Sequence, residues 1–232
     1  MEERRVKQTL LSTKPRENSL LVALAVTLVL FLVAALCWRV NSNWSALLAA
    51  STKGVFERGE YWQLLTGELV HANFGHLLSN ALLFTFFGYL LYAYFGFFVF
   101  PFLCFLLGGL VNYLSLLTYQ PADVRLVGAS GMVYLMVGFW LTMYMLIERR
   151  LSVRRRIIHA VGVGLIVLMP TVLHQEVSYR THAIGVVVGM LSALVYYRFA
   201  RRRIQSVEVS EPLDDMASDT VSEEPWLEVD DI

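Results

Sequence analysis

Charged residues are scarce in this sequence. They make up 16% of the 232 residues, against roughly a quarter in an average soluble domain, whereas 56% of the residues are hydrophobic. The mean hydropathy is accordingly +0.55. A chain of this length cannot hide so much apolar surface in one soluble core. We therefore exclude an ordinary soluble domain and expect lipid to cover part of the chain.

Acidic residues and metal-binding patterns are also missing from the apolar region. Between Glu68 and Glu148 the only acid is Asp123. The chain has no His-Glu-x-x-His run, and His71 and His76 would point about 140° apart on a helix. We therefore expect neither a zinc site nor another cofactor. A transporter is disfavoured as well, because transporters generally place ionisable groups near the middle of the membrane.

Six apolar segments approach the roughly 20 residues that a helix needs to cross a bilayer. The first is long enough to span the membrane and lacks a clear small-residue cleavage site, so we interpret it as an anchor helix and not as a cleaved signal. The sequence therefore predicts an all-α membrane protein with a six-helix domain over residues 20–200. The six segments are 20–38, 76–95, 97–117, 130–147, 157–173 and 182–199.

Lysine and arginine are distributed unevenly around these segments. With six spans, fourteen of the 19 basic residues fall on one side of the membrane, within residues 1–19, 148–156 and 198–203. Because basic loops are retained in the cytoplasm, we expect both termini on that side. The basic runs then serve as topology signals and contacts to lipid headgroups, and we expect no nucleic-acid partner. The other five basic residues are Arg39, Lys53, Arg58, Arg125 and Arg180.

The C-terminal end has no basic residue at all. From Ile204 to Ile232 there are ten acids and few large apolar side chains. Such a composition cannot bury enough apolar surface to fold, so we expect residues 201–232 to form a disordered cytoplasmic tail. Residues 1–19 form a basic cytoplasmic N-terminus. The first outer loop, about residues 39–75, is half apolar, and its Trp and Tyr residues favour the membrane interface.

Three polar sets stand where predicted helices begin at the outer face. Polar residues at membrane depth are costly and usually functional. The charge distribution that fixed the topology used none of them, so their convergence on one side of the membrane is an independent indication of a site. The sets are His71, His76 and Asn80 at the second helix, Gly128, Ser130 and Gly131 at the fourth, and His182 and Gly185 at the sixth.

Each set has a chemical use. Ser130 begins a predicted helix, where unpaired N–H groups and the helix dipole favour the negative charge that forms when a serine attacks a carbonyl. His182 is a candidate general base for that attack. His76 and Asn80 share one helix face and are spaced to donate hydrogen bonds to the oxyanion. The sixth helix carries no acid, so we expect a Ser–His dyad, with Tyr134 stacked on the imidazole.

The same motifs have a simpler interpretation as packing residues. A Gly-x-Ser-Gly run in a membrane helix is, by itself, more often a packing seam, and a single buried histidine is more often part of a hydrogen-bonded core. Gly185 and Gly189 form a Gly-x-x-x-Gly pattern that, with Gly138, favours close approach of the fourth and sixth helices. This packing is compatible with catalysis, because it would bring His182 to Ser130.

Taken together, the motifs resemble those of the rhomboid intramembrane serine proteases. The residues that carry the resemblance are His71, His76, Asn80, Gly128, Ser130, Gly131, Tyr134, Gly138, His182, Gly185 and Gly189. The resemblance covers about residues 20–200 and implies a six-helix rhomboid-like bundle with a Ser130–His182 dyad. It also implies an oxyanion hole formed by His76, Asn80 and the backbone N–H of Ser130, with His71 in a supporting role.

Two positions depart from the family pattern. The Trp-Arg pair of the first outer loop is Trp62-Gln63 here, and Tyr92 stands close to the position where a glutamate is often found. Both positions are associated with architecture more than with chemistry, so the departures leave the dyad in place.

The resemblance implies a serine endopeptidase that cleaves the transmembrane segments of other membrane proteins near their outer ends. The alternative is a catalytically inactive relative that binds membrane clients, although such relatives usually lack the serine or the histidine. The compact core without a targeting peptide points to a bacterial inner membrane. The sequence indicates neither the natural substrate nor an oligomeric state.

Overall fold

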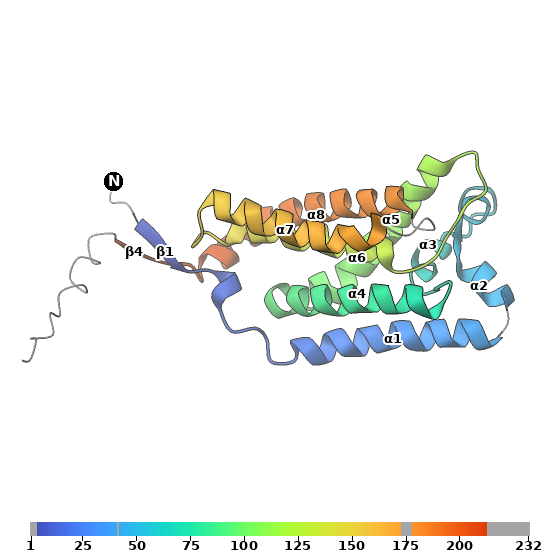
Figure 1. The fold of residues 1–232 in the computed structure, drawn as a ribbon, viewed down its shortest axis with the longest axis horizontal. Coiled ribbons are helices and arrows are strands. Elements are labelled where there is room, and N and C mark those ends of the chain that lie inside the picture. The colour runs from blue at the N-terminus through green and yellow to red at the C-terminus, as the bar shows by residue number, and fades with distance from the viewer. Residues whose placement is uncertain (1–3, 41, 173–177, 213–232) are drawn as a thin grey trace, which may run out of the picture.

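The computed structural model describes residues 4–40, 42–172 and 178–212. In this part of the chain, six long helices lie side by side and form the body of the molecule (Figure 1). Their bounds are α1 Ser19–Val40, α4 Phe74–Phe95, α5 Cys104–Tyr119, α6 Ser130–Ile147, α7 Val153–Val172 and α8 Tyr179–Gln205.

Five helical segments in the described residues are long and apolar enough to cross a membrane. They are Ser19–Arg39, Phe74–Phe95, Phe98–Tyr119, Ser130–Ile147 and Tyr179–Gln205. The third joins α5 to the preceding turn η3, Phe98–Leu103. Helix α7 packs against α6. It has three consecutive arginines in its first turn and is not among these five segments. The sixth span therefore stays a prediction, and residue 173 of that predicted segment lies outside the described residues.

Helix α6 lies at the centre of the bundle. It packs against α4, α5, α7 and, most extensively, α8. Glycines bring α6 and α8 into backbone contact: a methyl group at Gly138 would meet the backbone of Val186, and one at Gly189 would meet the carbonyl oxygen of Leu135. At Gly185 it would lie 2.5 Å from the carbonyl oxygen of Gly131. The close approach predicted from the glycine pattern is therefore present.

Two loops that the charge distribution predicts to be outer loops join at one end of the bundle. The first loop forms α2, Ser42–Leu48, β2, Ala50–Ser51, the π-helical turn η2, Lys53–Glu57, and α3, Gln63–Thr66. Strand β2 pairs antiparallel with β3, Arg125–Leu126, from the loop that precedes α6. This end lies on the right in Figure 1.

Gln63, which departs from the family pattern, fastens the first outer loop internally. Its side chain is buried; Nε2 donates to the Leu47 carbonyl oxygen at 3.1 Å, and Oε1 accepts from the Ser51 hydroxyl at 3.0 Å. An amide supplies both a donor and an acceptor. Gln63 therefore connects α2, β2 and α3 without a buried charge.

Both terminal segments lie at the opposite end of the bundle. Strand β1, Arg4–Gln8, pairs antiparallel with β4, Val209–Pro212, and η1, Leu10–Ser12, follows β1 (Figure 1). Lys7 and Glu211 form an ion pair of 3.0 Å, and Arg149 pairs with Glu208 at 3.2 Å.

The first part of the expected disordered tail therefore has regular structure. Composition alone suggested disorder from residue 201, but residues 201–205 continue α8 and residues 209–212 form β4. The backbone of β4 finds its partner at the other end of the chain, which composition does not reveal. Residues 213–232 lie outside the described residues.

We predict that Gly189→Ala destabilises the bundle by about 1–3 kcal/mol, because an added methyl group overlaps the α6 backbone. The measurement is the melting temperature of the purified protein in detergent. The matched control is Gly162→Ala on α7, where an added methyl group meets nothing within 4 Å. It should stabilise the protein by about 0.5–1 kcal/mol through helix propensity. Equal melting temperatures for the two variants would contradict the close α6–α8 contact.

Candidate functional site

Ser130 is the first residue of α6 and is half-buried. Gly128, two residues earlier, has a φ of +104°, which an L side chain rarely adopts. Its N–H donates to the Gly67 carbonyl oxygen at 2.9 Å, so the first outer loop holds the turn in place. A helix start leaves N–H groups without partners inside the helix. The turn therefore positions Ser130 next to backbone N–H groups that are free to donate hydrogen bonds.

His76 and Asn80 lie against this turn. Asn73 caps α4, and its Oδ1 accepts from the backbone N–H of His76 at 2.8 Å. A methyl group at Gly128 would lie 2.6 Å from His76 Cε1 and 3.3 Å from Asn80 Nδ2. Asn80 Nδ2 is buried and has no hydrogen-bond partner among the described residues. Glycine at 128 thus leaves the space in which two side-chain donors approach the start of α6.

His71 braces the same turn from the first outer loop. Its Nε2 accepts from the backbone N–H of Ala129 at 3.3 Å, and Nδ1 lies 3.3 Å from the Leu69 carbonyl oxygen, a pattern that assigns the proton to Nδ1. The His71 and His76 rings are 5.3 Å apart. Burial and the neighbouring His76 imidazole lower the pKa of His71 to about 4, so the ring is neutral at physiological pH. A neutral ring is the form that can accept from Ala129.

His182 lies in the first turn of α8. Ser178 caps this helix, and its Oγ accepts from the Thr181 N–H at 3.3 Å. The His182 side chain is 6% exposed and stacks on Tyr134, with ring centroids 4.0 Å apart and planes inclined by 18°. Its Nδ1 is buried without a hydrogen-bond partner among the described residues. The stacking expected from the sequence is therefore present, and the ring contact orients the imidazole.

The starts of α6 and α8 lie next to each other. A methyl group at Gly131 would lie 3.0 Å from Thr181 Cγ2, and one at Gly185 would lie 3.2 Å from Tyr134 Cβ. The neighbours of Ser130 thus contact the neighbours of His182. No hydrogen bond between the Ser130 hydroxyl and the His182 ring occurs among the described residues. These residues also contain no group of three His, Cys, Asp or Glu side chains arranged to hold a metal ion.

Glu68 is a buried acid that the sequence analysis did not single out. Its side chain is 1% exposed, and neither carboxyl oxygen has a hydrogen-bond partner among the described residues. It fits against Gly108 of α5, where any side chain would collide with the carboxyl group. Burial raises the pKa of Glu68 well above the usual value of a glutamic acid. The sequence offered one signal that Glu68 lies near the site, namely its position three residues before His71.

A comparison with models of protein families shows which family the chain belongs to. The model described as "Rhomboid domain" matches residues 58–199, which is more than half of the chain. This chain belongs to the Rhomboid family. The matched range contains every site residue predicted from the sequence, and rhomboid membership together with the apolar helices makes the chain an integral membrane protein.

A curated relative comes from Bacillus subtilis (strain 168). The chain is 26% identical to YdcA, which is named provisionally as a rhomboid protease, over 146 residues. The aligned region covers 62% of this chain and 72% of YdcA. At this identity the likeness supports a rhomboid-type function and leaves the individual catalytic residues to be tested.

We predict that Glu68→Gln flattens the loss of stability that accompanies rising pH. Because the folded-state pKa of Glu68 is raised, stability is complete below the unfolded-state pKa of about 4.3 and falls as pH rises through the folded-state value. Within that window each pH unit costs up to about 1.4 kcal/mol. Glutamine keeps the shape and cannot lose a proton, so the variant should melt at a higher temperature than the wild type above neutral pH.

The test compares melting temperatures in detergent above about pH 7.5, where His71 is neutral in the folded state and almost entirely neutral in the unfolded state. The matched control is Glu57→Gln, an exposed acid of the same outer loop. It should leave the pH dependence as in the wild type. An unchanged pH dependence in Glu68→Gln would show that the carboxyl group is not held in a desolvated position.

Proposed function

We propose that this rhomboid is an intramembrane serine endopeptidase with a Ser130–His182 dyad. The observation that carries the proposal is the stacking of His182 on Tyr134, one turn from Ser130, at the end of the bundle where α6 and α8 begin. Family membership and the likeness to YdcA support a rhomboid-type activity. Ser130 and His182 are the residues that we propose perform this activity.

In the first half of the reaction, the Ser130 hydroxyl attacks the scissile carbonyl while His182 takes its proton. The carbonyl oxygen becomes an oxyanion, and the N–H of Ser130, the Asn80 amide and the His76 ring donate hydrogen bonds to it. One such donor is typically worth roughly 2.7–4 kcal/mol in the transition state. The C–N bond then breaks, and His182 gives its proton to the departing amine. An acyl-enzyme on Ser130 remains.

In the second half, water attacks the acyl-enzyme and His182 takes a proton from it. The ester bond breaks, the new C-terminal carboxyl group leaves, and the proton returns to Ser130. No third group with a negative charge is needed to hold the imidazole, because the Tyr134 ring fixes its plane. This arrangement replaces the orienting carboxylate of a triad by an aromatic contact.

The substrates we propose are the transmembrane segments of other membrane proteins. Ser130 lies at the end of the bundle that carries the outer loops, where exposed Trp44, Tyr61 and Trp62 suit a membrane interface. The carbonyl groups inside a helical substrate are already hydrogen-bonded, so segments with Gly or Pro, which unwind locally, are favoured. The distribution of basic residues supports cytoplasmic termini and a site that opens to the outside. We place the protein in a bacterial inner membrane.

A second candidate is a binding protein without protease activity that retains membrane clients. It is favoured by one observation: the described residues contain no hydrogen bond between Ser130 and His182. Labelling by a serine-reactive fluorophosphonate separates the two candidates. A protease is labelled at Ser130, and the label disappears in Ser130→Ala. A binding protein is not labelled above the level of that variant.

We predict that Ser130→Ala and His182→Ala each lower cleavage of a tagged transmembrane substrate by at least about a thousandfold, because each removes one half of the dyad. Cleavage is measured in detergent with a panel of substrates, and the products are mapped by mass spectrometry. The matched control is Ser192→Ala, deeper in α8, whose hydroxyl donates to the Gly189 carbonyl oxygen of the preceding turn. Turnover retained by Ser130→Ala would exclude the proposed nucleophile.

A further inference from the structure

The exposed face of α8 changes character at Arg198. Up to Val195 it is apolar, and from Arg198 it is cationic. Residues three and four apart share a helix face, so both parts belong to one continuous stripe. The exposed apolar members are Val187, Leu191, Leu194 and Val195, and the cationic members are Arg198, Arg201 and Arg202.

These three arginines, which we term the α8 arginine cluster, line a surface hollow. The hollow has a volume of about 610 Å³ and is bordered by Arg198, Arg201, Arg202, Phe199 and Gln205. Arg201 Nε donates to the Gln205 side-chain oxygen at 3.2 Å, which holds one wall in place. A hollow of this size accommodates a small anionic group among the guanidinium groups.

The α8 arginine cluster lacks neutralising partners. Among the described residues, none of its three guanidinium groups forms an ion pair with a carboxylate. Three other basic residues at the same end of the bundle are paired: Lys7 with Glu211, Arg149 with Glu208, and Arg150 with Glu148. The C-terminal helix dipole favours cations but only partly offsets the repulsion of like charges on one face. An external anion is one source of compensation, and the acids within residues 213–232, which lie outside the described residues, are the other.

The depth of the cluster in the bilayer indicates which anion. Helix α8 has 27 residues, and about 20 suffice to cross the hydrocarbon core. A helix that enters near Tyr179 therefore leaves the core near Arg198, and the cluster lies at the level of the phosphate groups. Phe199 is 83% exposed there, which suits an aromatic ring at the membrane interface. The apolar stripe before Arg198 then faces the acyl chains.

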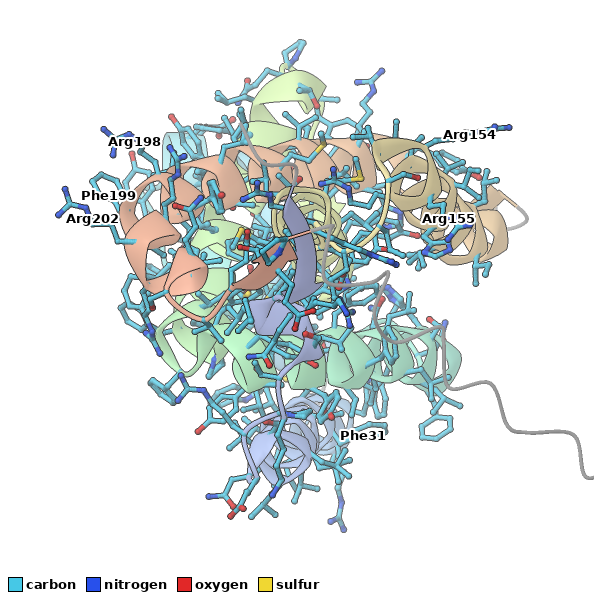
Figure 2. The ribbon with its side chains drawn as sticks, turned by 90° about the vertical axis from the view of Figure 1, so that its left-hand side faces the viewer. Phe31, Arg154, Arg155, Arg198, Phe199 and Arg202 are labelled. Atoms are coloured by element: carbon cyan, nitrogen blue, oxygen red, sulfur yellow. The ribbon has the colours of Figure 1, made fainter. Side chains whose placement is uncertain are left out.

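The α8 arginine cluster is separate from the other free arginines of this end. Figure 2 shows Arg198, Phe199 and Arg202 projecting on one side of the bundle and Arg154 and Arg155, at the start of α7, on the other. Arg154 and Arg155 are equally exposed. They therefore provide a matched comparison of equal charge at a different place.

We propose that the stripe of α8 is a binding site for an anionic phospholipid. The phosphate group lies in the hollow between Arg198 and Arg202, and an acyl chain follows Leu194 and Leu191 along the helix. Arginine suits this role because its planar group donates two parallel hydrogen bonds to phosphate. The site requires only that α8 crosses the membrane and is independent of the proposed protease activity.

The experiment titrates the full-length protein in detergent with phosphatidylglycerol or phosphatidylcholine and counts bound lipids by native mass spectrometry. We expect one phosphatidylglycerol to bind more tightly than any phosphatidylcholine. The double variant Arg198→Gln/Arg202→Gln should weaken that binding about 30-fold, since each basic residue near a membrane surface is worth about 5.5-fold. The control Arg154→Gln/Arg155→Gln should keep the affinity of the wild type.

Several outcomes would overturn the site. The first is equal affinity of the wild type for the two lipids. The second is an equal loss in both double variants, which would indicate general attraction to positive charge. The third is unchanged phosphatidylglycerol binding in Arg198→Gln/Arg202→Gln together with a lower melting temperature in lipid-free detergent. That result would show that a segment of the protein itself, and not a lipid, compensates the arginines.

Discussion

The backbone contact between α6 and α8 is the constraint on which the candidate site depends. Ser130 and His182 stand 52 positions apart in the sequence and begin different helices. In lipid, apolar side chains gain little by leaving one apolar surrounding for another, so helices associate through close packing. Glycine at 138, 185 and 189 permits that packing. The same residues that resemble a simple packing seam therefore determine where the imidazole lies, and the two interpretations of the motif describe one structure.

Much of the fold could be predicted because the bilayer imposes a length and a polarity on each helix. The predicted segment 130–147 coincides with α6, and 76–95 differs from α4 by two residues at its start. The segment 182–199 was too short, because hydropathy reports the part of a helix that crosses lipid. Arginine is a good helix former, and α8 continues to Gln205 beyond the apolar run. Element types were thus predictable, and helix ends outside the hydrocarbon core were not.

Apart from the approach of α6 to α8, contacts between distant segments escaped prediction. The burial of Glu68 depends on Gly108, forty residues later, which leaves room for the carboxyl group. Nothing in the local sequence marks that partnership, because an acid in an interfacial loop is ordinarily exposed. The pairing of β2 with β3 joins residues 50 and 126 in the same way. By contrast, the site motifs were recognisable because polar groups are rare at membrane depth, and their positions at helix starts follow from local sequence.

The pairing of β1 with β4 brings the two ends of the described polypeptide together. Arg4 lies opposite Pro212, so this contact spans almost the entire described polypeptide. During synthesis from the N-terminus, β1 is made first and lacks its partner strand until β4, which follows the last long helix, has been synthesised. This small sheet can therefore form only after all six long helices have been synthesised.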